Sequence, residues 1–218
     1  MRFALCLTAL TASLAAAQPG PVVFSELMWM GSTASSADEW IELYNRGDRE
    51  VDLTGWTITR LTAEGEQVML QVSAGKVAAG AVFLIANYAA RDANSLLAVQ
   101  ADLVDAAIAL PNTKLQLRLY DGDPAAGGRL ADVADDGTGA PAAGDGQLKQ
   151  AMVRVAFDRD GSQREAWATA VESSGWDAGA AELGTPGSLH GTGSPAAGEP
   201  TSGTPVGSAC WAFVKAGR

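Results

Sequence analysis

The amino-acid sequence predicts an all-β fold, most simply an antiparallel β-sandwich. Seven or more short apolar runs follow one another, separated by turns rich in Gly, Asp and Asn, as in sandwiches built from short strands. At 114–123, "KLQLRLYDGD" alternates apolar and polar residues with the period of two that a half-buried strand requires. The runs do not alternate with long amphipathic helices, which disfavours a doubly wound α/β fold.

The remaining expected strands are equally short. They lie at 22–30, 39–45, 56–61, 66–72, 81–87, 127–137 and 151–157. The unbroken apolar run at 81–87 suits a strand that is buried on both faces. Residues 92–110 could form a helix, which their Ala and Leu content favours locally, or a strand with a long loop.

The two ends of the chain differ from its middle. Residues 1–17 begin with Met1-Arg2, continue through an uncharged apolar run and end in three alanines, as a signal peptide does. This run is shorter than the ~20 residues of a membrane span, so we expect no transmembrane anchor. Residues 191–218 contain a Gly/Ser/Pro/Thr-rich stretch that lacks the apolar residues to offset ordering entropy, so we expect a disordered linker and a short tail there. The sequence thus predicts a secreted protein (extracellular, cell-surface or periplasmic) with one domain at 20–190.

Charge and cysteine content exclude several functions. Without residues 1–17 the chain has 14 basic and 25 acidic residues, a balance that repels phosphate backbones and makes nucleic acid an unlikely partner. Cys210 is then the only cysteine and His190 the only histidine. These are too few ligands for a zinc site, and a catalytic Cys–His pair at the end of the chain would lack a rigid scaffold. An odd thiol in an exported protein suggests intermolecular pairing or a tolerated residue, and our hypothesis is that Cys210 tethers the protein to another thiol or a surface component.

A series of short motifs runs through the whole predicted domain. The residues that carry it are Ser25, Glu26, Glu39 to Leu43, Asn45, Val51 to Leu53, Gly55-Trp56, the segments 79–87 and 115–123, Arg154, Trp167 and "GTPGSLH" at 184–190. This pattern resembles the bacterial lamin tail domain, with His190 where the family usually has Asn. The resemblance implies an immunoglobulin-like β-sandwich and a non-catalytic binding or scaffold module of exported proteins. Its partner would be a protein or a cell-surface component.

Two sequence features have a structural explanation that we prefer to a functional one. Arg46-Gly47-Asp48 is a tripeptide known from cell adhesion, but it lies between two expected strands, where a turn is sufficient reason for it. Trp40 and Trp56 are expected in the sandwich core rather than on a ligand platform.

Acidic residues raise two further possibilities. Glu26, Glu39 and Glu42 could form the paired carboxylates of a hydrolase, but nothing in the sequence indicates the cleft that such an acid needs. We expect them instead to orient loops or to accept hydrogen bonds from backbone amides. Loop carboxylates could bind calcium, although turns favour Asp without any ion. The candidates are Asp121, Asp123, Asp158 and Asp160.

The alternative to a protein-binding module is a carbohydrate-binding sandwich. In that reading Trp29, Trp167 or Trp176 would be exposed and would stack on sugar rings. The sequence therefore predicts a binding module with no catalytic residue, no metal site and no cofactor. It also predicts two stacked sheets whose filled interior leaves no pocket for reaction chemistry.

Overall fold

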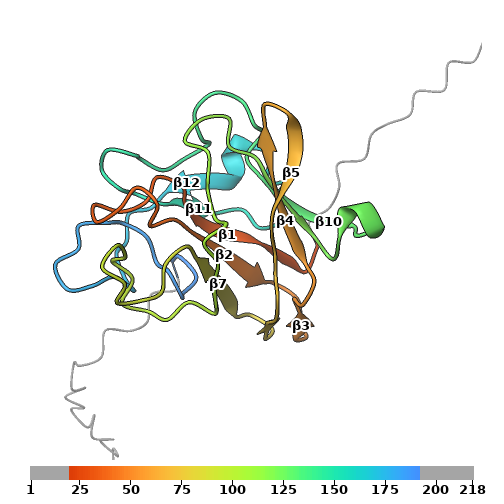
Figure 1. The fold of residues 1–218 in the computed structure, drawn as a ribbon, viewed down its shortest axis with the longest axis horizontal. Helices are drawn as coiled ribbons and strands as arrows, with labels where there is room; N and C mark the ends of the chain where they lie inside the picture. The colour runs from red at the N-terminus through yellow and green to blue at the C-terminus, as the bar shows by residue number, and fades with distance from the viewer. Residues whose placement is uncertain (1–19, 192–218) are drawn as a thin grey trace, which may run out of the picture.

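The computed structural model describes residues 20–191, and these residues form an all-β fold (Figure 1). They contain twelve strands and two short 3-10 helices, η1 (Pro124–Ala126) and η2 (Arg164–Ala166), and no α-helix. Within this range no helix has the length and apolar character needed to cross a membrane. The predicted fold class is confirmed, whereas the predicted signal peptide (1–17) and nearly all of the predicted linker lie outside the described residues.

The first sheet has six strands in the order β12-β11-β1-β2-β7-β8. Their bounds are Trp167–Thr169 (β12), Met152–Arg154 (β11), Val22–Met28 (β1), Trp40–Asn45 (β2), Val82–Ala86 (β7) and Leu103–Val104 (β8). All neighbours are antiparallel except β7 and β8, which are parallel. The first strand therefore lies inside the sheet, between β2 and a strand from the far end of the domain.

The second sheet has four strands in the order β10-β9-β4-β5, and all its pairs are antiparallel. Their bounds are Leu130–Ala134 (β10), Leu117–Tyr120 (β9), Thr57–Thr62 (β4) and Gly65–Gln71 (β5). The short pair β3 (Val51–Asp52) and β6 (Lys76–Val77) forms a third, two-stranded sheet. Figure 1 shows β4, β5 and β10 on one side of the molecule and the six-stranded sheet on the other.

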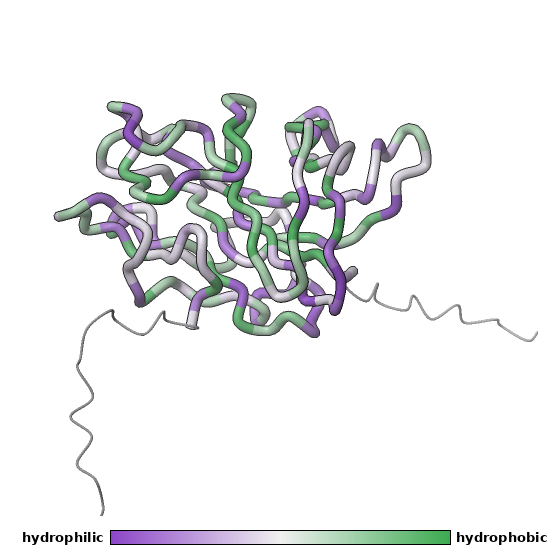
Figure 2. Tube along the Cα trace, turned by 90° about the horizontal axis from the view of Figure 1, so that it is seen from below, coloured by the Kyte–Doolittle hydropathy of each residue, from purple (hydrophilic) through white to green (hydrophobic). Residues whose placement is uncertain are grey.

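The core lies between the two sheets and draws on nearly every strand. Its largest fully buried side chains are Trp40, Phe24, Leu27, Met28, Ile41, Leu43, Leu53, Ile58, Leu84, Ile85, Leu97 and Ile108. Figure 2 shows apolar and polar residues alternating in short stretches along the coloured part of the trace. This distribution is what many short strands with one or two buried faces produce.

The alternation patterns identified most strands correctly. In β9, Leu117 and Leu119 are buried and the residues between and after them are half-buried, as a period of two requires. In β7 the last four residues are all buried, which agrees with a strand covered on both faces. Trp40 and Trp56 are core residues, as expected.

Residues 92–110 do not form the helix that their composition favours. They form a loop with one two-residue strand, β8, in parallel register with β7. The reason is the hydrogen-bonding edge that β7 presents: the amides of Asp102 and Asp105 donate to the carbonyls of Leu84 and Ala86, and the Asp102 carboxylate accepts from the Leu84 amide. Tertiary pairing thus overrides a weak local propensity.

Candidate binding groove

An open groove of about 980 Å³ lies where β4 ends. Residues of four segments line it: 36, 37 and 39 before β2, 60–63 at the end of β4, 108–111, 113 and 114 in the loop before β9, and 137–139 in a turn. The core between the sheets is filled, as expected, and this groove lies outside it, at the surface. Three of the four walls come from loops, whose course a strand pattern does not predict.

Glu39 is the acidic residue that lines this groove, and it is 7% exposed. Its Oε2 atom accepts a hydrogen bond of 2.8 Å from the Leu110 amide. Burial raises the pKa of Glu39 to about 7, while the Leu110 amide and the nearby charge of Arg60 act in the opposite direction. The groove thus contains a carboxyl group whose charge changes near neutral pH.

The other walls are mostly apolar, with two basic side chains. Leu61, Ile108 and Leu110 provide apolar surface. The Arg60 guanidinium donates to the Ala109 carbonyl at 2.6 Å, which ties β4 to the opposite wall. Lys114 also lines the groove and is exposed.

Glu26 and Glu42 do not line the groove, although the sequence grouped them with Glu39. They are paired residues on the neighbouring strands β1 and β2, and they are 1% and 0% exposed. Glu26 accepts hydrogen bonds from the amide and the hydroxyl of Thr185, at 2.9 and 2.7 Å. Glu42 accepts from the Ser25 hydroxyl at 2.8 Å and from the Gly187 amide at 2.9 Å. The pair fastens the "TPG" segment near the end of the domain to the sheet, as the sequence analysis expected of these glutamates.

The electrostatics of this pair follow from burial and from like charge. Desolvation raises the pKa of Glu26 to about 7, and its hydrogen bonds with Thr185 oppose that rise. Desolvation and the charge of Glu26 raise the pKa of Glu42 well above its usual range. Both effects favour the neutral carboxyl group.

Other buried carboxylates also hold loops through backbone amides. Asp38 accepts from the Leu96 amide and Glu182 from the Thr33 amide, at 2.8 and 2.7 Å. Asp135 accepts from the Ala142 amide at 2.8 Å. These contacts join segments of the chain that no strand pairing connects.

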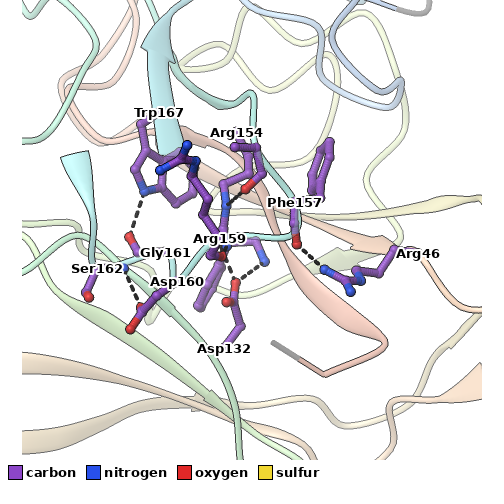
Figure 3. Close-up of polar contacts among 11 residues, drawn as sticks. Arg46, Asp132, Arg154, Phe157, Arg159, Asp160, Gly161, Ser162 and Trp167 are labelled. Atoms are coloured by element: carbon purple, nitrogen blue, oxygen red, sulfur yellow. Dashed lines mark hydrogen bonds and ion pairs between the residues drawn. The ribbon is translucent and has the colours of Figure 1, made fainter. Parts of the chain in front are cut away.

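Arg154 forms the centre of a second buried polar cluster, shown in Figure 3. Its Nη1 atom lies 3.2 Å from Oδ2 of Asp132, and both side chains are almost completely buried. The same Asp132 oxygen accepts from the Phe24 amide at 2.9 Å. Desolvation raises the pKa of Asp132, against the opposing charge of Arg154. The cluster joins β10 of the second sheet to β1 and β11 of the first.

The remaining donors of Arg154 hold the loop between β11 and η2. Its Nε and Nη2 atoms donate to the carbonyls of Ala156 and Arg159, at 3.1 and 2.7 Å. Its guanidinium carbon lies 5.0 Å from the ring centre of Trp167, within range of a cation–π contact. The Trp167 indole donates to the Gly161 carbonyl at 2.7 Å, so the loop is fixed from both sides (Figure 3).

The tryptophans that the carbohydrate-binding alternative requires on the surface are buried. Trp29, Trp167 and Trp176 are 7, 6 and 9% exposed. Each indole N–H donates to a loop carbonyl, of Ala143, Gly161 and Gly184 respectively. Their aromatic area is used in packing, and their polar atom anchors a loop.

The Arg46-Gly47-Asp48 tripeptide forms the turn after β2, as expected. The Gly47 amide donates to the Asn45 side chain at 3.0 Å, and the Arg46 guanidinium bonds to the Phe157 carbonyl (Figure 3). Asp48 is exposed beside Arg49.

Three of the four aspartates considered for calcium stabilise turns. Asp121 accepts from the Arg129 amide, Asp123 from the Ala125 amide and Asp160 from the Ser162 amide. In residues 20–191, no group of three or more His, Cys, Asp or Glu side chains is arranged to hold a metal ion. Asp158 has an exposed position in the same loop as Asp160, and Cys210 lies outside the described residues.

Sequence reasoning missed Arg60, Asp132 and Leu110. Arg60 is the only charged residue in the expected strand at 56–61, and such a break in an apolar pattern is the signal that could have found it. Asp132 is one of four charged residues at 127–137, so the pattern does not single it out. Leu110 contributes its backbone amide, which leaves no trace in the sequence.

The fold and the site together define a class of protein. Two packed, largely antiparallel sheets with loops anchored by buried carboxylates form an immunoglobulin-like β-sandwich. A family model described as Lamin Tail Domain matches residues 15–135, more than half of the chain, and the chain belongs to this family. No curated protein matches the chain. The family match includes Glu26, Glu39, Glu42 and Asp132, and it ends before Arg154.

Proposed function

We propose that this protein is an exported, non-catalytic binding module of the lamin tail type. In this proposal its partner is a protein or a cell-surface component, and the groove at the end of β4 receives part of it. The observation that carries the proposal is the groove itself: it is open and mostly apolar, and a single buried acid lines it. Family membership supports the type of module, and the signal-like residues 1–17 support export.

The dimensions and walls of the groove suit a ligand. Binding pockets usually measure about 300–1,000 Å³ and combine apolar walls with a few polar groups. Here the polar groups are the Glu39 carboxyl group, the Arg60 guanidinium and the exposed Lys114 ammonium. Because Arg60 is bonded to Ala109, it also fixes the width of the groove.

The distribution of acids supports binding rather than hydrolysis. Paired-acid hydrolysis of glycosides needs two carboxyl groups about 5–10 Å apart with the substrate between them. Within the described residues, Glu39 is the only acid in the lining of the groove. Glu26 and Glu42 are buried elsewhere and each holds a loop.

The test is a binding screen with matched groove variants. The protein without residues 1–17 is applied to an array of short peptides and to an array of glycans. Ala63→Arg and Ala109→Arg place a long cation on exposed positions of the groove wall. Ala125→Arg makes the same change in η1, which follows the opposite end of β9. We expect peptide binding that both groove variants abolish and that Ala125→Arg leaves intact.

Two outcomes would overturn the proposal. One is peptide binding that Ala63→Arg and Ala109→Arg leave unchanged, since the groove would then have no part in it. The other is hydrolysis of glycoside or ester substrates that Glu39→Gln abolishes in a folded protein.

A further inference from the structure

We infer that a segment of this same chain, Trp211-Ala-Phe-Val-Lys215, occupies the groove at the end of β4 and competes there with outside partners. The inference concerns the regulation of the groove and so rests on the proposed function. The segment lies outside the described residues. Its sequence, the chemistry of the groove and the length of chain between them point to this contact.

The Leu110 amide and the nearby charge of Arg60 only partly offset the burial of Glu39. Glu39 receives its hydrogen bond at Oε2, from Leu110, and in residues 20–191 no donor bonds to its Oε1. The second oxygen of this carboxylate can accept a charge-assisted hydrogen bond from an ammonium group. The raised pKa of Glu39 reports the same deficit, because burial outweighs the groups that favour its charge. An occupant that suits the groove therefore combines apolar bulk with one cation.

Residues 211–215 have this composition. Trp211 and Phe213 are the only aromatic residues after residue 191, and Lys215 follows them after one valine. Aromatic side chains bury large apolar areas, which suits walls formed by Leu61, Ile108 and Leu110. Lys215 would supply the ammonium group for Glu39, and its long stem can cross apolar surface to reach it.

The intervening chain is long enough for this contact. Residues 192–210 number nineteen and can extend over up to about 60 Å. A domain with the size of the described part is roughly 40 Å across. Attachment to the same chain also gives the segment an effective concentration in the millimolar range. A weak contact is therefore sufficient to fill the groove.

The test uses the single cysteine that remains when residues 1–17 are absent. A nitroxide spin label is attached to Cys210, next to Trp211, and backbone amide signals of the ¹⁵N-labelled protein are recorded. If the segment occupies the groove, the amides of Leu110, Gly137 and Gly139 broaden strongly. The amide of Gly127 at the end of η1 is the internal control, because η1 and the groove lie at opposite ends of β9, and it keeps its intensity.

Variants of the tail provide the matched comparison without touching the folded domain. Trp211→Ala with Phe213→Ala, in the labelled protein, should reduce the broadening at the groove amides several-fold. Val206→Ala, a change of similar kind nearer the domain, should leave it unchanged. Glu39→Gln retains the acceptor for Leu110 and removes the charge, so we expect weaker broadening there as well.

Three outcomes would overturn the inference. The first is equal broadening of Gly127 and the groove amides, and the second is no effect of the Trp211→Ala and Phe213→Ala pair. The third is broadening in ¹⁵N-labelled molecules without a nitroxide when they are mixed with spin-labelled molecules, which would place the contact between copies. The binding screen separates this inference from the proposed function. Peptides that bind the groove with equal strength in the parent and the tail variant would refute the tail contact and leave the binding module intact. A docked tail on a protein that binds no ligand of either array would support the tail contact and refute the proposed binding module.

Discussion

At the scale of single residues, two Arg–Asp ion pairs of similar length differ in how much they contribute to stability. Arg129 and Asp121 approach to 3.1 Å, but the arginine side chain is 87% exposed. Arg154 and Asp132 approach to 3.2 Å with almost no exposure. Water stabilises the separated charges in the first case, so the exposed pair adds little to stability. In the second case each charge depends on the other and on its hydrogen-bond partners.

We predict that Arg154→Ala lowers the free energy of unfolding by about 3–5 kcal/mol, because it leaves Asp132 buried without its counter-charge. Arg129→Ala is the matched control and should cost less than about 1 kcal/mol. Urea unfolding monitored by tryptophan fluorescence measures both changes. Similar losses in the two variants would contradict the role given to the buried cluster.

At the scale of elements, the loops of this domain are held by individual hydrogen bonds rather than by strand pairing. Gly161 illustrates how closely one loop approaches a strand. A Cβ atom at Gly161 would lie 1.8 Å from the Val133 carbonyl oxygen and 2.4 Å from Nη1 of Arg154. The same glycine carbonyl accepts from the Asp135 amide and from the Trp167 indole. No side chain fits there without moving β10 or the arginine.

We predict that Gly161→Ala destabilises the fold by several times as much as Gly127→Ala. Gly127 has a positive φ of 97° but open space around its Cβ position, so alanine there costs only about 1 kcal/mol of backbone strain. Alanine at Gly161 must displace backbone and the buried ion pair. Thermal unfolding followed by circular dichroism ranks the two variants, and the reverse order would refute this account of the loop.

The strands could be predicted from sequence and most loops could not. Alternation in β9 and the continuous apolar run of β7 result from burial, and burial follows from side-chain type. The course of residues 92–110 depends on the free edge of β7, which exists only after the sheet has formed. The groove combines both cases, since Glu39 belongs to a predicted motif while the Leu110 amide comes from an unpredicted loop.

At the scale of the whole molecule, the acidic surface and the buried acids respond to pH in opposite ways. Burial raises the pKa of both Glu26 and Glu39 to about 7. Glu172 faces Glu26 and adds to this rise, and Asp102 does the same for Glu42. Hydrogen bonds and Arg118 lower the pKa of the more exposed Glu66. The buried groups therefore favour folding at mildly acidic pH.

We predict that stability falls as the pH rises from about 5 to about 8. Between the ordinary pKa of a glutamate and about 7, the folded state binds more protons at Glu26 and Glu39 than the unfolded state does. Stability that depends on these protons is present below the ordinary pKa and is lost as the pH passes through 7. The expected decrease for the two groups together is on the order of 5 kcal/mol, measured by urea unfolding at several pH values.

Glu42→Gln is the control for this pH dependence. Glutamine can still accept from the Gly187 amide and donate to the Ser25 hydroxyl, while the titratable group with the strongly raised pKa is removed. The variant should therefore lose less stability than the parent between pH 5 and pH 8. A profile that rises across this range in the parent protein would contradict the assignment of raised pKa values.

The position of β1 inside its sheet has a consequence for how the protein is made. Ribosomes deliver the N-terminal strand first, but its neighbour β11 and the arginine that balances Asp132 arrive only after residue 151. Until then the nascent polypeptide has an open strand edge and an uncompensated acid, and such intermediates are prone to aggregation. The first sheet can therefore be completed only when almost the whole domain has been synthesised. A product that stops where the family match ends, at residue 135, would lack β11 and β12 and could not complete this sheet.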